Sequence, residues 1–183
     1  MTRPQLRRVL LVGFMGAGKT TVGRRVADRL RWRFIDFDDV VEAEAGTSIA
    51  ELFRTGGEAR FRELEHEVAR RLLREEEVVL GSGGGWAAAP GRLDSMPAGT
   101  ATFWLKVSAE TAVERANMGG GRRPLLEGPD PVATAAELLE GRTPSYGRAR
   151  WTVDTEHSTV EDVSARILGI LGREFPEQAL NER

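Results

Sequence analysis

The sequence contains no cysteine, two histidines, and only two lysines among its 26 basic residues. Without cysteine the chain can form neither disulfides nor catalytic thiolates, which fits a reducing compartment such as the cytoplasm. His66 and His157 have no partners at metal-ligand spacing, so the sequence offers no zinc site. The scarcity of lysine makes the position of each lysine informative, because arginine serves almost everywhere else.

Long apolar runs and an excess of one charge are also missing. No stretch approaches the roughly 20 apolar residues of a membrane-spanning helix. The run VLLVGFMGAG after the basic N-terminus leads into a glycine motif, so we expect a first strand there and no signal peptide. The formal net charge of −2 favours neither nucleic acid nor an anionic membrane as a partner. We expect a cytoplasmic monomer, with a single domain over residues 1–173 and a flexible tail over 174–183.

Apolar runs typical of buried strands alternate with amphipathic stretches typical of helices. The predicted strands are 8–14, 33–38, 77–85, 101–107 and 151–154. The predicted helices are 18–31, a short one capped by Ser48 and Glu51, about 58–75, 108–117, about 132–142 and about 160–171. This alternation favours an α/β fold, a three-layer α/β/α sandwich around a five-stranded parallel sheet. Ligands bind at the carboxyl ends of such strands, where segments 13–20, 36–38 and 81–85 lie.

One of the two lysines lies in the segment GFMGAGKT, residues 13–20. It matches the pattern G-x-x-x-x-G-K-[ST] of a phosphate-binding loop. Glycines let backbone N–H groups approach phosphates closely, and the following helix presents its N-terminus to the anion. Lys19 supplies a compact charge for the β- and γ-phosphates, and the Thr20 hydroxyl is placed to ligate Mg²⁺. The predicted nucleotide-binding residues are Gly16, Ala17, Gly18, Lys19, Thr20 and Thr21.

The rest of the chain narrows the class of nucleotide-binding protein. A guanine-specific switch carries an N-K-x-D segment, which is impossible here because Lys106 is the only other lysine. A motor ATPase would normally be larger. Residues 118–131 form a glycine-rich segment with two arginines, which suits the lid of a small kinase, since phosphoryl transfer requires charge neutralisation and exclusion of water.

Four further segments resemble the successive motifs of the shikimate kinase family. They are FIDFDDVVEAEAGTSIAELFRTGGEARFRELE (34–65), GSGGG (81–85), RRPLL (122–126) and RTPSYGRA (142–149). The likeness runs from about residue 8 to residue 171. It implies a P-loop fold of the nucleoside-monophosphate-kinase-like group, with a helical substrate-binding region over about 36–65 and a lid over about 116–131. It also implies transfer of phosphate from ATP, with Mg²⁺, to the 3-hydroxyl of shikimate.

The resemblance implies which residues hold the acceptor. Shikimate is a small ring with one carboxylate and three hydroxyls, and arginine forks suit carboxylates. Arg62 and Arg142 are the implied carboxylate clamp. The backbone of Gly83, Gly84 and Gly85 would approach the substrate where a side chain would clash.

The resemblance also assigns the groups around the transferred phosphate. Asp38 would contact the accepting hydroxyl, as a base or chiefly to orient it, since a loose transition state asks little of a base. Asp36, expected on the same side of the strand, would hold Mg²⁺ through water. Arg123 of the lid would bind ATP and neutralise charge on the phosphoryl group. Lys19, Asp38 and Arg123 are therefore the predicted catalytic residues. We expect the acidic residues Glu58, Glu63 and Glu65 to be helix-surface charges, and the resemblance implies that Glu58 also supports the substrate-binding helix without a catalytic role.

The sequence departs from the family pattern at three places. Ala116 stands near the position of the lid arginine that often stacks on adenine, so Arg115 and Asn117 are the candidates to replace it. Phe37 replaces a small polar residue between the two aspartates, and Trp86 follows the glycine triplet. Either aromatic side chain can reshape the acceptor pocket.

Two other functions stay open from the sequence alone. A two-arginine clamp would also serve a kinase for another small hydroxy acid, such as gluconate. A non-catalytic nucleotide-binding regulator is the third reading, although a decayed kinase would be expected to lose Lys19, Asp38 or Arg123. ADP release that depends on shikimate distinguishes a shikimate kinase from both of these alternatives.

Overall fold

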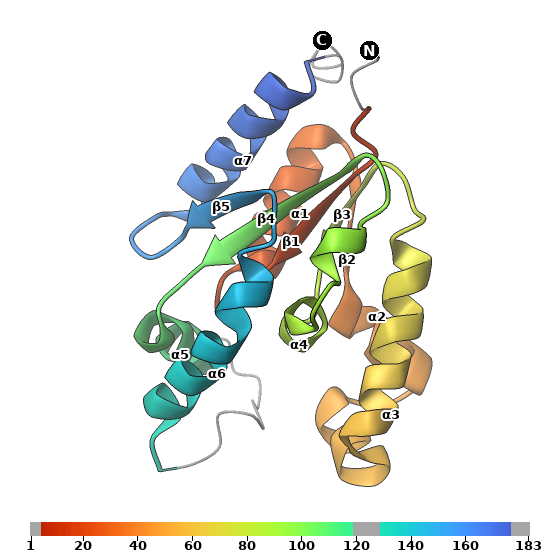
Figure 1. The fold of residues 1–183 in the computed structure, drawn as a ribbon, viewed down its shortest axis with the longest axis vertical. Helices are drawn as coiled ribbons and strands as arrows, with labels where there is room; N and C mark the ends of the chain where they lie inside the picture. The colour runs from red at the N-terminus through yellow and green to blue at the C-terminus, as the bar shows by residue number, and fades with distance from the viewer. Residues whose placement is uncertain (1–4, 119–128, 177–183) are drawn as a thin grey trace.

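The computed structural model describes residues 5–118 and 129–176 of the 183-residue chain. Five strands form one parallel sheet in the order β2-β3-β1-β4-β5 (Figure 1). The strands are β1 Arg8–Val12, β2 Arg33–Asp36, β3 Val78–Gly81, β4 Thr100–Lys106 and β5 Trp151–Asp154. The predicted α/β fold with a five-stranded parallel sheet is confirmed.

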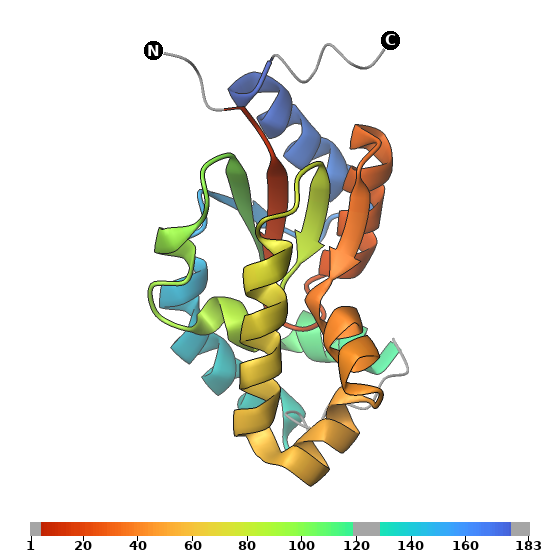
Figure 2. The same ribbon diagram turned by 90° about the vertical axis from the view of Figure 1, so that its right-hand side faces the viewer.

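Helices cover both faces of this sheet. They are α1 Lys19–Leu30, α2 Phe37–Ala45, α3 Ile49–Leu72, α4 Gly84–Ala88, α5 Ala109–Met118, α6 Pro131–Tyr146 and α7 Val160–Glu174, with a 3₁₀ turn at Leu93–Ser95. Figure 2 shows α1 and α7 on one side of the sheet and α4 and α6 on the other. Within the described ranges, no helix is long and apolar enough to cross a membrane.

The central strand β1 explains why the phosphate loop is held rigidly. All five residues of its sequence RVLLV are buried, between β3 and β4. Such a continuous apolar run is typical of a parallel strand that is covered on both faces. Even Arg8 is only 3% exposed, and its guanidinium donates to Glu75 O and Thr100 Oγ1 at 2.9 and 3.0 Å. The loop after β1 therefore starts from a fully buried strand at the centre of the sheet.

The predicted strand 33–38 is two residues too long. It ends at Asp36, whose carboxylate accepts a hydrogen bond from the Asp38 N–H at 3.1 Å and caps α2. Asp38 thus lies in the first turn of a helix, and the expectation that both aspartates share one side of a strand was wrong. Strand 77–85 is also shorter than predicted, because β3 ends at Gly81 and the short helix α4 follows.

Three helices also extend beyond their predicted bounds. α3 begins at Ile49 and joins the two predicted helices across a kink at Gly57, where φ is 72°. α6 reaches Tyr146 and includes Pro144. α7 continues to Glu174, and Phe175 is 6% exposed against Trp151. Glu174 and Phe175, the first two residues of the predicted tail 174–183, therefore belong to the folded domain.

Hydrogen bonds join the loop between β5 and α7 to the start of α5. Ser108 caps α5 by accepting from the Thr111 N–H, as predicted, and its own N–H and hydroxyl donate to Glu156 at 2.8 and 2.6 Å. Together with the hydroxyl of Thr111, these donors lower the pKa of Glu156 to about 2. Charged Glu156 therefore ties the two segments together at neutral pH.

Candidate active site

The segment between β1 and α1 has the backbone of a phosphate-binding loop. Gly13, Gly16 and Gly18 have φ values of 141°, 74° and 88°, which side chains rarely allow. A Cβ on Gly16 would also collide with the backbone oxygen of Ala112. The loop closes through a hydrogen bond from Ala17 N–H to Phe14 O at 3.2 Å. Backbone conformation thus requires all three glycines, and close packing requires Gly13 and Gly16 as well.

The N-terminus of α1 is open to an anion. Its cap residue Gly18 makes no side-chain hydrogen bond, and its first turn carries no acidic residue. Lys19 Nζ donates to Gly13 O and Phe14 O at 2.9 Å each, which holds the ammonium over the loop. The helix dipole and this ammonium together favour a phosphate at that place. The six predicted nucleotide-binding residues, 16–21, all lie in this loop or in the first turn of α1.

Thr20 and Asp36 are the two residues predicted to serve Mg²⁺, and the structure brings them together. Thr20 Oγ1 donates to Asp36 Oδ2 at 2.8 Å. Both offer hard oxygen atoms, which suit Mg²⁺. In the described part of the chain, no three acidic or histidine side chains form a metal cage. The pair of Thr20 and Asp36 fits a Mg²⁺ ion that is bound mainly by nucleotide phosphates and water, since this ion rarely occupies all-protein cages.

The glycine triplet that begins α4 is the meeting point of the predicted acceptor residues. A Cβ on Gly83 would lie 3.0 Å from Asp38 Oδ1, and a Cβ on Gly84 would lie 3.4 Å from Arg142 Nη1. A Cβ on Gly85 would overlap the Arg62 guanidinium, 2.6 Å from its Cζ. Gly84 and Gly85 therefore face the two predicted arginines, whereas the side chain nearest to Gly83 is that of Glu65, with Asp38 next to it. The same Gly84 position lies 3.5 Å from Gly13 O, so this cluster borders the phosphate loop.

Glu65 was predicted to be a surface charge, and that prediction was wrong. Its side chain is 2% exposed, and its Oε2 accepts from Arg62 Nη1 at 2.7 Å. Burial raises the pKa of Glu65, while Arg62 opposes that change. Glu58 also contacts Arg62, at 3.2 Å, from a more exposed position. The two glutamates fix the guanidinium from both sides, and their i+3 and i−4 spacing from Arg62 was the available sequence signal.

Tyr146 is a second positioning residue that the sequence analysis missed. It is fully buried, and its hydroxyl donates to Gly84 O at 2.8 Å. Burial raises its pKa, so the hydroxyl stays protonated as a donor. This bond joins the end of α6 to the glycine triplet, one turn after Arg142. Arg142 itself lies 5.5 Å from the ring centre of Phe14, next to the phosphate loop.

The two aromatic departures from the family pattern form part of the core. Phe37 and Trp86 are 0% and 4% exposed, and their rings meet edge to face at 5.3 Å. Phe37 precedes Asp38 and Trp86 follows Gly85, so the two packed rings hold these neighbours in place. Any influence on the acceptor must therefore act through packing.

The lid prediction falls largely outside the described residues, including Arg122 and Arg123. Of its first residues, Ala116 is 4% exposed. Arg115, a candidate adenine partner, donates to Thr155 Oγ1 and Thr155 O at 3.2 and 2.8 Å, and its contact with adenine stays a prediction. Arg115 therefore serves the junction between α5 and the loop after β5. The role of Arg123 remains a prediction.

Comparison with known proteins agrees with this geometry. The shikimate kinase family model matches residues 15–171. Shikimate kinase from Synechococcus sp. (strain RCC307) is 40% identical over 166 residues, 91% of this chain and 85% of that protein. A curated shikimate kinase from Nitrobacter winogradskyi is 40% identical over 167 residues, 91% of this chain and 78% of that protein.

Solved structures give the same result. Shikimate kinase from Acinetobacter baumannii in complex with shikimate superposes with a TM-score of 0.83 at 34% identity, covering 91% of this chain and 93% of the other. A gluconokinase from Sinorhizobium meliloti has a TM-score of 0.62 at 19% identity over the full length of both chains, a likeness of fold alone. The family match and the relatives at 40% identity decide the assignment: this chain belongs to the shikimate kinase family.

Proposed function

We propose that this chain transfers the γ-phosphoryl group of ATP to the 3-hydroxyl of shikimate, giving shikimate 3-phosphate and ADP. The observation that carries the proposal is the glycine triplet, which lies against Asp38, Arg142 and Arg62, with Glu65 also packed on Gly83, and borders the phosphate loop. One carboxylate-binding pair and one hydroxyl-binding carboxylate around a side-chain-free wall suit a small polyhydroxylated ring acid. Family membership supports the same reaction.

On this proposal, each residue has a defined task. Lys19 and the α1 N-terminus hold the phosphates, and Asp38 orients the accepting hydroxyl for in-line attack. Thr20 and Asp36, the latter through water, hold Mg²⁺, which would neutralise charge on the β- and γ-phosphates. Arg123 supplies further positive charge when the lid closes.

The acceptor is held by its carboxylate. Arg62 and Arg142 approach it from α3 and α6, and paired guanidinium contacts give direction as well as affinity. Glu58 and Glu65 hold Arg62 in place before the acceptor arrives, so less side-chain entropy is lost on binding.

The proposal also covers the compartment, oligomeric state and pathway of the enzyme. We place it in the cytoplasm as a monomer in the biosynthesis of chorismate and the aromatic amino acids, without nucleic acid or membrane partners. The cysteine-free composition and the net charge of −2 support this placement.

The test of the function is ADP release with Mg-ATP and shikimate, gluconate or no acceptor. We expect turnover with shikimate, and the same background rate with gluconate as without an acceptor. Turnover on gluconate but not shikimate would assign the pocket to another hydroxy acid. ATP binding without turnover on either acid would favour the non-catalytic regulator.

Loss of either clamp arginine should separate the two substrates. Arg62→Gln and Arg142→Gln are each expected to raise the KM for shikimate about 10- to 100-fold, since a hydrogen bond to a charged group contributes about 1.5–3 kcal/mol. The KM for ATP should change less than about twofold, because neither side chain belongs to the phosphate loop. Steady-state kinetics with each substrate varied measure both values.

Arg60→Gln is the matched control, since Arg60 lies on the same helix, is exposed and pairs only with the exposed Glu63 among the described residues. It should leave both KM values close to those of the unmodified enzyme. Equal weakening of ATP and shikimate by Arg62→Gln or Arg142→Gln would contradict the clamp.

A further inference from the structure

A hollow of about 240 Å³ lies between α3, α4 and the segment around the 3₁₀ turn. Four basic side chains line it: His66, Arg70, Arg74 and Arg92. His66 and Arg70 are one helical turn apart on α3, and Arg74 continues that row just beyond its end, so all three lie on one side. We refer to this feature as the basic hollow.

The three arginines of the basic hollow form no ion pair with a carboxylate in the described residues, although Arg92 is near enough to the buried Glu65 to favour its charged form. Within residues 5–118 and 129–176, no carboxylate lies within ion-pair distance of Arg70, Arg74 or Arg92. By contrast, the adjacent Arg71 turns to α2 and pairs with Glu44. Arg92 instead contacts the His66 ring. Several like charges gathered around one hollow repel each other, and an anion bound among them would remove that cost.

The floor of the basic hollow is apolar. Leu73 and Trp86 are 8% and 4% exposed, Met96 and Pro97 add further apolar surface, and Ser95 is the remaining polar residue of the lining. The Arg92 guanidinium lies 5.6 Å from the centre of the Trp86 ring. An apolar floor beneath a basic rim is complementary to a ring that carries an anionic group.

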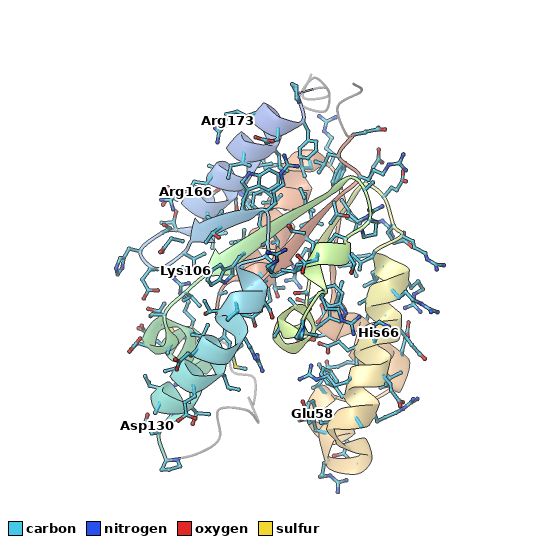
Figure 3. All side chains as sticks on the ribbon, in the orientation of Figure 1. Glu58, His66, Lys106, Asp130, Arg166 and Arg173 are labelled. Atoms are coloured by element: carbon cyan, nitrogen blue, oxygen red, sulfur yellow. The ribbon has the colours of Figure 1, made fainter. Side chains whose placement is uncertain are left out.

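The basic hollow is separate from the acceptor site. Arg62 turns toward Gly85, whereas His66 lies one turn farther along α3, above Glu58 in Figure 3. Trp86 divides the two regions, because it lines the hollow and also packs on Phe37 beside Asp38. Arg142, the other clamp residue, is not part of the lining.

We propose that the basic hollow is a binding site for a small organic anion, a carboxylate or phosphate attached to an apolar ring. Arg70, Arg74 and Arg92 bind the anionic group, and the ring lies against Trp86 and Leu73. The volume is below the roughly 300–1,000 Å³ of drug-sized pockets, which restricts the ligand to about one ring. Guanidinium forks bind carboxylate and phosphate alike, so the two groups have to be distinguished by measurement.

Calorimetric titration with benzoate and with phenyl phosphate tests this site. The protein is first saturated with shikimate and Mg-ADP, so that the acceptor and nucleotide sites are filled. We expect one equivalent of probe to bind, and the tighter of the two probes identifies the preferred anionic group. Phenol and inorganic phosphate, which each lack one half of the ligand, should bind at least about tenfold more weakly than phenyl phosphate.

Variants then locate the bound probe. Arg70→Gln with Arg74→Gln should weaken probe binding at least about tenfold, and Arg71→Gln, the neighbour that faces α2, should change it less than about twofold. An unchanged midpoint of thermal unfolding shows that the variants fold. Binding of neither probe, equal effects of the double variant and Arg71→Gln, or equal binding of inorganic and phenyl phosphate would overturn the proposal. These variants decide the matter even if shikimate proves not to be the acceptor.

Discussion

Lys19→Met is expected to lower kcat for shikimate-dependent ADP release by about 10²- to 10³-fold, the range typical for loss of one preorganised group that stabilises transition-state charge. The ammonium is already held over the loop by Gly13 O and Phe14 O, so little reorganisation is needed when phosphate arrives. Methionine preserves the length of the side chain and removes the charge. The fold should survive, because the side chain is not part of the buried core.

Lys106→Met is the control that this sequence offers. Lys106 is the only other lysine, lies at the exposed end of β4 and contributes its backbone oxygen, not its ammonium, to the contact with Thr155 (Figure 3). It should retain nearly full activity. Stopped-assay ADP release and thermal unfolding of both variants separate catalysis from stability. If the kcat of the Lys19→Met enzyme lies within tenfold of the kcat of the unmodified enzyme, the ammonium has no part in the proposed mechanism.

The phosphate-binding loop could be predicted from the sequence because its determinants are local. The spacing of Gly13, Gly18 and Lys19 after a buried strand specifies a turn with positive φ and an open helix N-terminus, and the structure has both. The alternation of strands and helices likewise follows from apolar periodicity, whereas the order of the strands in the sheet comes from the structure alone.

The boundary at Asp36 could not be placed by periodicity, because the short alternation in FIDFD suits a strand. What decides it is the side chain of Asp36, which caps a helix, and the burial of Phe37 and Val41 four residues apart. The capping residue and the i, i+4 pair were visible in the sequence. They compete with the strand pattern, and only tertiary packing determines which of the two applies.

The contacts among the acceptor residues could not be predicted from any local sequence pattern. Arg62 and Arg142 are each more than twenty residues from the glycine triplet, and the fold brings Arg62 to Gly85 and Arg142 to Gly84. The burial of Glu65 depends on that same convergence, since Gly83 leaves the space that its carboxylate fills. From the sequence, these contacts came only from resemblance to a family, whereas the structure gives a physical reason for each glycine.

Asp38→Asn is expected to lower kcat at least about 100-fold, with the KM for ATP nearly unchanged, because loss of a positioned acid–base group typically costs 10²–10⁴-fold. The amide keeps the size of the side chain and leaves the Asp38 N–H free to bond Asp36, so the start of α2 should stay intact. Asp39→Asn, one residue along and more exposed, is the control and should stay within a few-fold of the unmodified enzyme.

Comparison with Asp38→Ala tells which task the carboxylate performs. If Asp38 mainly orients the hydroxyl, asparagine can still accept its hydrogen bond and should be clearly more active than alanine. If proton removal limits the rate, both variants lose the base and should be equally slow. A loose transition state leaves little charge on the attacking oxygen, so we expect asparagine to be the more active of the two. An Asp38→Asn enzyme with full activity would contradict both tasks and would leave Gly83 facing a carboxylate without a part in the reaction.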